Sequence, residues 1–175
     1  MDERFLEMQQ KFKEHFEHVD ATAQIILKGH LLIEEALNSI LAKFVFHPEL
    51  MESANLRFAQ KIDVARSMSL SDHNNEMWEL VIAINSLRNE LAHSLKSEKR
   101  EKKTQRVRDL YLKFLDNEEM REQHKKESDE VVLLWAISFF LGFLTGFQRE
   151  VDRFRELVDT MDKAMNPHRH ARNAG

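Results

Sequence analysis

The chain has 175 residues, a formal net charge of −4 and no cysteine. This length is most simply one domain, with a core large enough to be stable without disulfides. The absence of cysteine excludes thiolate metal sites and is typical of a reducing compartment, so we expect a cytoplasmic protein. The acidic balance argues against a protein that coats nucleic acid over its whole surface. Only four glycines and two prolines interrupt long stretches rich in Glu, Lys and Leu, and this composition predicts an all-α fold.

Apolar residues at helical spacing predict about five to six helices, which we place at residues 3–18, 21–46, 56–68, 75–95, 96–115 and 129–164. Asp20 is suited to cap the second helix, which His47-Pro48 should end because the residue before a proline disfavours the α region. Ser71 or Asp72 is suited to cap the fourth, and Ser128 the last. We expect residues 1–165 to form one domain and NPHRHARNAG, residues 166–175, to be a disordered tail.

Residues 131–147, VVLLWAISFFLGFLTGF, contain no charge and reach the lower edge of the length of a membrane span. We interpret this run as a core or dimer-interface helix instead. It starts directly after Asp129-Glu130 rather than after a basic anchor, and the apolar pattern continues without a break into Phe154, Leu157 and Val158. A helix that is apolar on all sides is buried somewhere, and a second copy of the chain would bury this one.

A basic run lies at residues 96–108, KSEKREKKTQRVR, with seven basic residues and two acidic ones. Such a run is commonly a solvated helix face. Here it follows directly on LRNELAHSL, residues 87–95, so the alternative is a set of contacts to a nucleic-acid backbone.

The helix at 75–95 carries an arginine inside its apolar stripe. On a wheel at 100° per residue, Arg88 falls in line with Val81 and Ile84, while Asn89 and His93 continue the adjacent column. In the structural interpretation, Arg88 forms an ion pair with Glu34 or Glu35, and His93 interacts favourably with the helix dipole near the C-terminal end of its helix. The functional interpretation is a small polar site, because a permanently charged guanidinium is costly to bury and an imidazole transfers protons near neutral pH.

The segment LRNELAHS resembles the signature of HEPN domains, in which an arginine and a polar residue precede a histidine by a few positions. These are Arg88, Asn89 and His93 here. In addition, GHLLIEEALNSIL resembles the family's long helix with an embedded acidic residue. LRFAQKIDVARSMSL resembles the helix before the motif in mannitol operon repressor-like and HEPN-like helical proteins. The resemblance covers residues 20–97 and implies an antiparallel HEPN-like bundle that forms a homodimer.

What the resemblance implies for function is a metal-independent endoribonuclease without a cofactor, in which a 2′-hydroxyl attacks the adjacent phosphate. His93 would act as general base or acid, Arg88 would hold the phosphate, and Asn89 would orient either group, with Glu34 positioning Arg88. RNA contacts would come from Lys96, Lys99, Arg100, Lys102, Lys103 and Arg106. The expected partners are RNA, a cognate antitoxin, and a second copy of the chain whose motif helix faces the first across the dimer axis. No association with a membrane is expected. The biological role would be that of a toxin or defence effector.

The spacing adds a geometric condition. Arg88 and His93 are five residues apart, about 140° on the wheel, so their convergence needs a distortion near Leu91 or a contribution from both chains. The rival hypotheses are a non-catalytic helical regulator that acts through protein partners and a membrane-associated protein built on residues 131–147. We expect His30 to be a hydrogen-bonded helix residue and Trp78 and Trp135 to lie in the core. We expect no metal site from His15, His18, His168 and His170.

Overall fold

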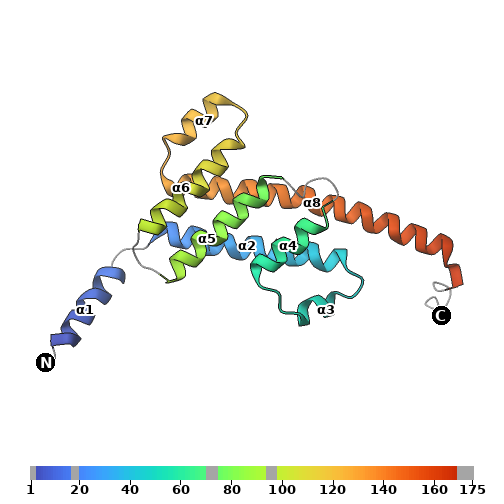
Figure 1. Ribbon diagram of the computed structural model, residues 1–175, viewed down its shortest axis with the longest axis horizontal. Helices are drawn as coiled ribbons and strands as arrows, with labels where there is room; N and C mark the ends of the chain where they lie inside the picture. The colour runs from blue at the N-terminus through green and yellow to red at the C-terminus, as the bar shows by residue number, and fades with distance from the viewer. Residues whose placement is uncertain (1–2, 17–19, 70–74, 94–97, 169–175) are drawn as a thin grey trace.

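The computed structural model describes residues 3–16, 20–69, 75–93 and 98–168. Within these residues the chain forms eight α-helices and no β-strand, so the all-α prediction is confirmed (Figure 1). The helices are α1 (Glu3–Phe16), α2 (Ala21–Phe44), α3 (Pro48–Ser53), α4 (Phe58–Ser67), α5 (Met77–His93), α6 (Glu98–Lys113), α7 (Glu118–Lys125) and α8 (Asp129–Met165). The predicted caps at Ser71 and Asp72 lie outside the described residues.

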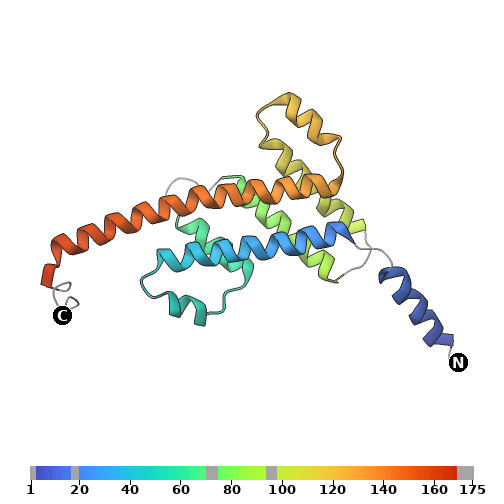
Figure 2. The same ribbon diagram turned by 180° about the vertical axis from the view of Figure 1, so that it is seen from behind.

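Helices α2 and α8 lie side by side and run in the same direction, which Figures 1 and 2 show from opposite sides. The Thr22 hydroxyl donates to Glu130 Oε1 (3.3 Å) near the start of both helices, and Lys43 Nζ donates to Asp152 Oδ1 (3.0 Å) farther along both. Between them Gly29 is buried against Ile137, where a Cβ atom would overlap the isoleucine side chain. The expectation of an antiparallel bundle is therefore wrong for this central pair, because the intervening helices return the chain to the end at which α2 began.

The hydrophobic core lies on one side of the α2/α8 pair, under α4, α5 and α6. Trp78 of α5 is fully buried and meets the rings of Phe140, Phe143 and Phe147 edge-on. Trp78 is a core residue, as predicted. Trp135 is not, since 52% of its surface is exposed beside His124.

Two short helices, α3 and α7, were not predicted. Pro48 occupies the first turn of α3, so the His47-Pro48 pair that follows α2 also begins a new helix. Asn117 caps α7 by accepting hydrogen bonds from the backbone N–H groups of Glu119 and Met120. The predicted caps Asp20 and Ser128 are confirmed, because each side chain accepts from the third residue after it.

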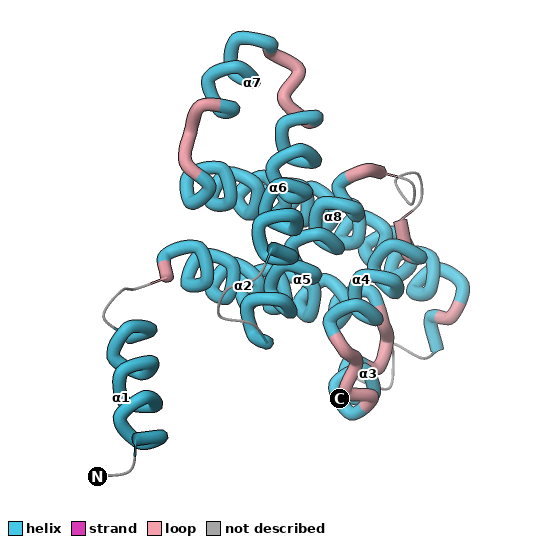
Figure 3. The backbone as a smooth tube through the Cα atoms, turned by 60° about the vertical axis from the view of Figure 1, so that its left-hand side comes forward, coloured by secondary structure: helices cyan, strands magenta, loops and turns pink. Residues whose placement is uncertain are grey.

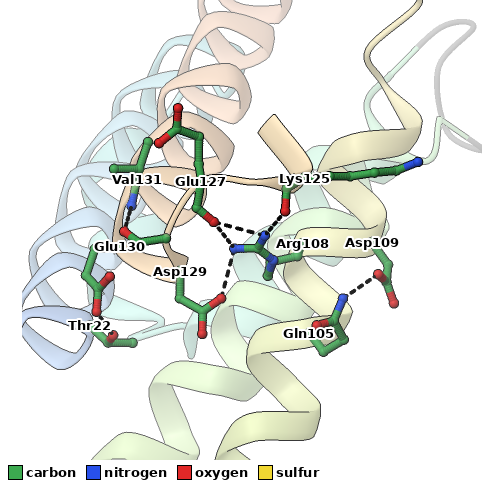
Figure 4. Close-up of polar contacts among 10 residues, drawn as sticks. Thr22, Gln105, Arg108, Asp109, Lys125, Glu127, Asp129, Glu130 and Val131 are labelled. Atoms are coloured by element: carbon green, nitrogen blue, oxygen red, sulfur yellow. Dashed lines mark hydrogen bonds and ion pairs between the residues drawn. The ribbon is translucent and has the colours of Figure 1, made fainter. Parts of the chain in front are cut away.

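Arg108 of α6 ties the end of α7 to the start of α8 (Figure 4). Its guanidinium donates to the backbone carbonyls of Lys125 (3.1 Å) and Glu127 (3.2 Å) and to Asp129 Oδ1 (2.9 Å). The residue is only 9% exposed, so this part of the basic run is structural.

The chain ends are less enclosed. Helix α1 stands apart from the other helices, as the tube in Figure 3 shows, and Phe5, Met8 and Phe12 on it are exposed. Of the tail predicted for 166–175, only residues 166–168 are described, and Asn166 caps α8. Within the described residues α8 alone is long and apolar enough to cross a membrane, a criterion that core helices of soluble proteins also meet.

Candidate functional site

The candidate site lies at the C-terminal end of α5, where the buried stripe of the helix gives way to polar side chains. Ile84 and Leu87 are fully buried, Arg88 is half-buried, and Asn89 and His93 are exposed. Helix α5 is α-helical as far as His93, so the structure contains no distortion at Leu91. The backbone positions of Arg88 and His93 thus remain on different faces of one helix.

The arginine side chain extends from its own face of the helix toward the adjacent column. Arg88 Nη1 donates to Asn89 Oδ1 at 3.3 Å, so the guanidinium reaches from the apolar stripe to the adjacent column. Asn89 and His93 are four residues apart and are therefore neighbours on that column, with Cβ atoms about 5–6 Å apart in a regular helix. One chain thus brings a guanidinium, an amide and an imidazole to one exposed end of α5.

Glu34 was predicted to position Arg88, and the structure gives it a different partner. Glu34 Oε1 accepts from Lys61 Nζ of α4 at 2.6 Å, and both side chains are partly buried. Among the described residues no carboxylate lies within ion-pair distance of Arg88. Within the described part of the chain, the guanidinium therefore has Asn89 as its hydrogen-bond partner and keeps further donors for a ligand.

Behind Arg88, His30 of α2 forms a buried polar contact between α2, α4 and α5. His30 is 4% exposed, its Nε2–H donates to Asn85 Oδ1 at 3.2 Å, and its ring lies 3.9 Å from that of Phe58. The prediction of a hydrogen-bonded helix histidine is confirmed. Asn85 and Lys61 were not predicted as site residues. Asn85 could have been found from the sequence, because it lies one turn before Asn89 in the same helical column.

The pKa of His30 is held below its ordinary value of 6.5, mainly because burial disfavours the charged ring. The hydrogen bond to Asn85 acts in the opposite direction. The positive charges of Arg88 and Lys61 lower this pKa further, while the carboxylate of Glu34 raises it. The field of Arg88 therefore reaches the buried imidazole, which is neutral at pH 7.

This lowered pKa predicts a loss of stability in mild acid. Below about pH 6.5 the unfolded chain takes up a proton at His30 that the folded chain does not, so the free energy of unfolding falls as the pH falls. The slope reaches at most about 1.4 kcal/mol per pH unit for one group. Urea unfolding of the wild type and His30→Gln between pH 5 and 8 measures it. Glutamine does not titrate, and its amide can still donate to Asn85. Equal pH profiles of the two proteins would therefore contradict a lowered pKa of His30.

The basic run is divided between two roles. Arg100 donates to Asp20 Oδ1 at 2.7 Å, and Lys103 donates to Glu90 Oε2 at 3.0 Å, so these two predicted RNA contacts are engaged within the chain. Lys99, Lys102 and Arg106 are exposed at i, i+3 and i+7, which places them along one side of α6. Lys96 lies outside the described residues.

The described part of the chain contains no group of three or more His, Asp or Glu side chains that could hold a metal ion. No protein-family profile matches the sequence, and comparisons with curated proteins and with solved structures gave no match. The assignment of a function therefore depends on the chemistry of α5 and α6.

Proposed function

We propose that this chain binds RNA and cleaves it as a metal-independent, HEPN-like endoribonuclease of the cytoplasm, in the role of a toxin or defence effector that a cognate antitoxin controls. The observation that carries the proposal is the hydrogen bond from Arg88 to Asn89, because it brings the guanidinium to the column that His93 shares. The exposed Lys99, Lys102 and Arg106, which follow in the next helix, would contact the phosphate backbone.

The proposed reaction needs no group beyond these side chains. The imidazole of His93 takes the proton from a ribose 2′-hydroxyl, whose oxygen attacks the adjacent phosphorus. The bond from phosphorus to the 5′-oxygen breaks, that oxygen receives a proton, and a 2′,3′-cyclic phosphate remains on the upstream fragment. Arg88 is suited to neutralise the charge that develops on the non-bridging oxygens, since no carboxylate of the described residues takes up its donors.

The test is incubation of the purified protein with RNA in the presence of EDTA, next to Arg88→Ala and His93→Ala. The wild type should produce fragments ending in 2′,3′-cyclic phosphate, and each variant should cleave at least about 100-fold more slowly. Arg57→Ala and His47→Ala serve as matched controls, because both residues are exposed and lie on other elements. Equal cleavage by all five proteins would remove Arg88 and His93 from the mechanism.

A second candidate is a non-catalytic helical regulator that acts through protein partners. It is favoured by the exposed apolar side chains of α8, among them Leu134 and Trp135. In that case Arg88 would serve the stability of the fold, and Arg88→Ala would lower the melting temperature strongly. The half-buried position of Arg88 and its exposed partner Asn89 instead favour a small change, which a thermal melt would measure.

A further inference from the structure

The uncharged segment of α8 is buried on one side only. Its opposite side, which we call the outer face, comprises Leu134, Trp135, Ser138, Gly142, Thr145 and Gly146. Phe139, which is 41% exposed, borders this face and packs on Tyr111 and Phe114. Figure 2 views the α2/α8 pair from this side, with the other core helices behind it. Leu134 and Trp135 are each 52% exposed, and a Cβ at Gly142 or Gly146 would meet no atom within 4 Å.

The outer face has large residues at one end and small residues at the other. If two α8 helices cross in opposite directions near residue 140, Leu134 of one copy lies over Gly146 of the other, Trp135 lies over Thr145, and Ser138 lies over Gly142. The bulky side chains then enter the space that the glycines leave open, and the backbones approach closely. A parallel pair would instead place Trp135 against Trp135 and glycine against glycine.

The charges that bound the outer face favour the same orientation. Glu127 precedes the segment, and Arg149 and Arg153 follow it on its exposed side. Among the described residues none of these three side chains has an ion-pair partner within the chain. In the antiparallel arrangement Glu127 of one copy lies opposite Arg153 of the other, whereas a parallel arrangement brings arginines of the two copies together.

We propose that the outer face of α8 binds the same face of a second copy of this chain in antiparallel orientation. Leu32 of α2, which follows Gly29 by three residues and is 53% exposed, extends this surface beside α8. The arrangement is isologous, so each contact occurs twice and the pair closes as a dimer. Because α5 packs on the other side of α8, each copy keeps its own Arg88, Asn89 and His93. This dimer is therefore different from one in which two motif helices face each other.

The first test is the molar mass of the full chain in solution, by light scattering after size exclusion. The wild type should elute at twice the chain mass of 20.8 kDa. Gly142→Arg should be monomeric, with a dissociation constant raised at least about 30-fold, because it places a charge at the centre of the interface. The variant should still fold, since the added side chain meets nothing in the monomer and arginine favours a helix over glycine.

The matched control is Gln123→Arg, which adds the same charge to an exposed position of α7 and should stay dimeric. A monomeric wild type, or a dimer that survives Gly142→Arg, would overturn the proposal. Co-sedimentation of a monomeric wild type with phosphatidylcholine vesicles would assign the face to lipid instead. Neither result depends on RNA cleavage, so this proposal and the proposed function fail separately.

The second test fixes the orientation and uses the absence of cysteine from the chain. In the antiparallel pair Leu134 lies about 18 Å along the axis from its own counterpart, at a rise of 1.5 Å per residue. A disulfide requires Cα atoms within about 7 Å. Leu134→Cys and Gly146→Cys should therefore cross-link only when the two proteins are mixed and oxidised. Efficient cross-linking of each variant alone would indicate a parallel pair and contradict the proposal.

Discussion

Mixing Arg88→Ala with His93→Ala protein should leave RNA cleavage as low as in either variant alone, at least about 100-fold below the wild type. The reason is that the Arg88–Asn89 hydrogen bond brings the guanidinium to the His93 column of its own chain. A heterodimer of the two variants then contains one defective site in each subunit. The measurement is the initial rate of cleavage after the two proteins have been unfolded and refolded together.

A composite site would give the opposite result. If Arg88 of one chain worked with His93 of the other, the mixed dimer would contain one intact pair and recover a substantial part of the rate. A control mixture of Arg88→Ala with wild-type protein should keep activity in proportion to the wild-type chains. Recovery in the variant mixture would show that the two motif helices face each other and would contradict a site within one chain.

Arg108→Met should lower the free energy of unfolding by about 2–4 kcal/mol. This is the largest effect on stability that we expect from replacing a single charged side chain. The substitution keeps the bulk of the side chain but removes every donor from the junction of α7 and α8. The carbonyls of Lys125 and Glu127 then lose their hydrogen bonds, as the contacts in Figure 4 indicate. Asp129 loses less, because its side chain is 52% exposed and is solvated by water.

Urea unfolding at pH 7 measures this effect. Arg108→Lys should lie between the wild type and Arg108→Met, because a single ammonium does not reach all three acceptors. The matched control is Lys43→Met, which removes an ion pair to Asp152 between side chains that are about 40% exposed, and should cost at most about 1 kcal/mol. A cost for Arg108→Met no larger than that of the control would contradict the structural role of Arg108.

Much of the helical content could be predicted because it depends on local pattern. Asp20 and Ser128 were recognised as caps from their residue type and from the apolar periodicity that follows each of them. Helices α3 and α7 were missed because six and eight residues are too few to show a period. The parallel course of α2 and α8 was missed because direction depends on the path of all the helices between them.

The candidate site was predictable in its residue types and only partly in its contacts. The order of Arg88, Asn89 and His93 along one helix was enough to predict that the apolar stripe of α5 gives way to polar side chains at its C-terminal end. The partner of Glu34 was not predictable, because Lys61 and Arg88 are both positively charged and lie on two different helices. Which of them reaches Glu34 depends on how these helices pack against α2. The basic run behaves in the same way, because packing between helices buries Arg108 and leaves Lys102 exposed to solvent.

The sequence by itself determined that the chain is helical, where its long helices begin, and that an arginine interrupts the apolar stripe of α5. These properties follow from interactions over three or four residues, which a linear pattern contains. Only the tertiary structure decided that α2 and α8 run parallel, that Glu34 pairs with Lys61, and that one side of the uncharged segment of α8 is exposed. Each depends on which helix faces which, and packing between distant segments sets that choice.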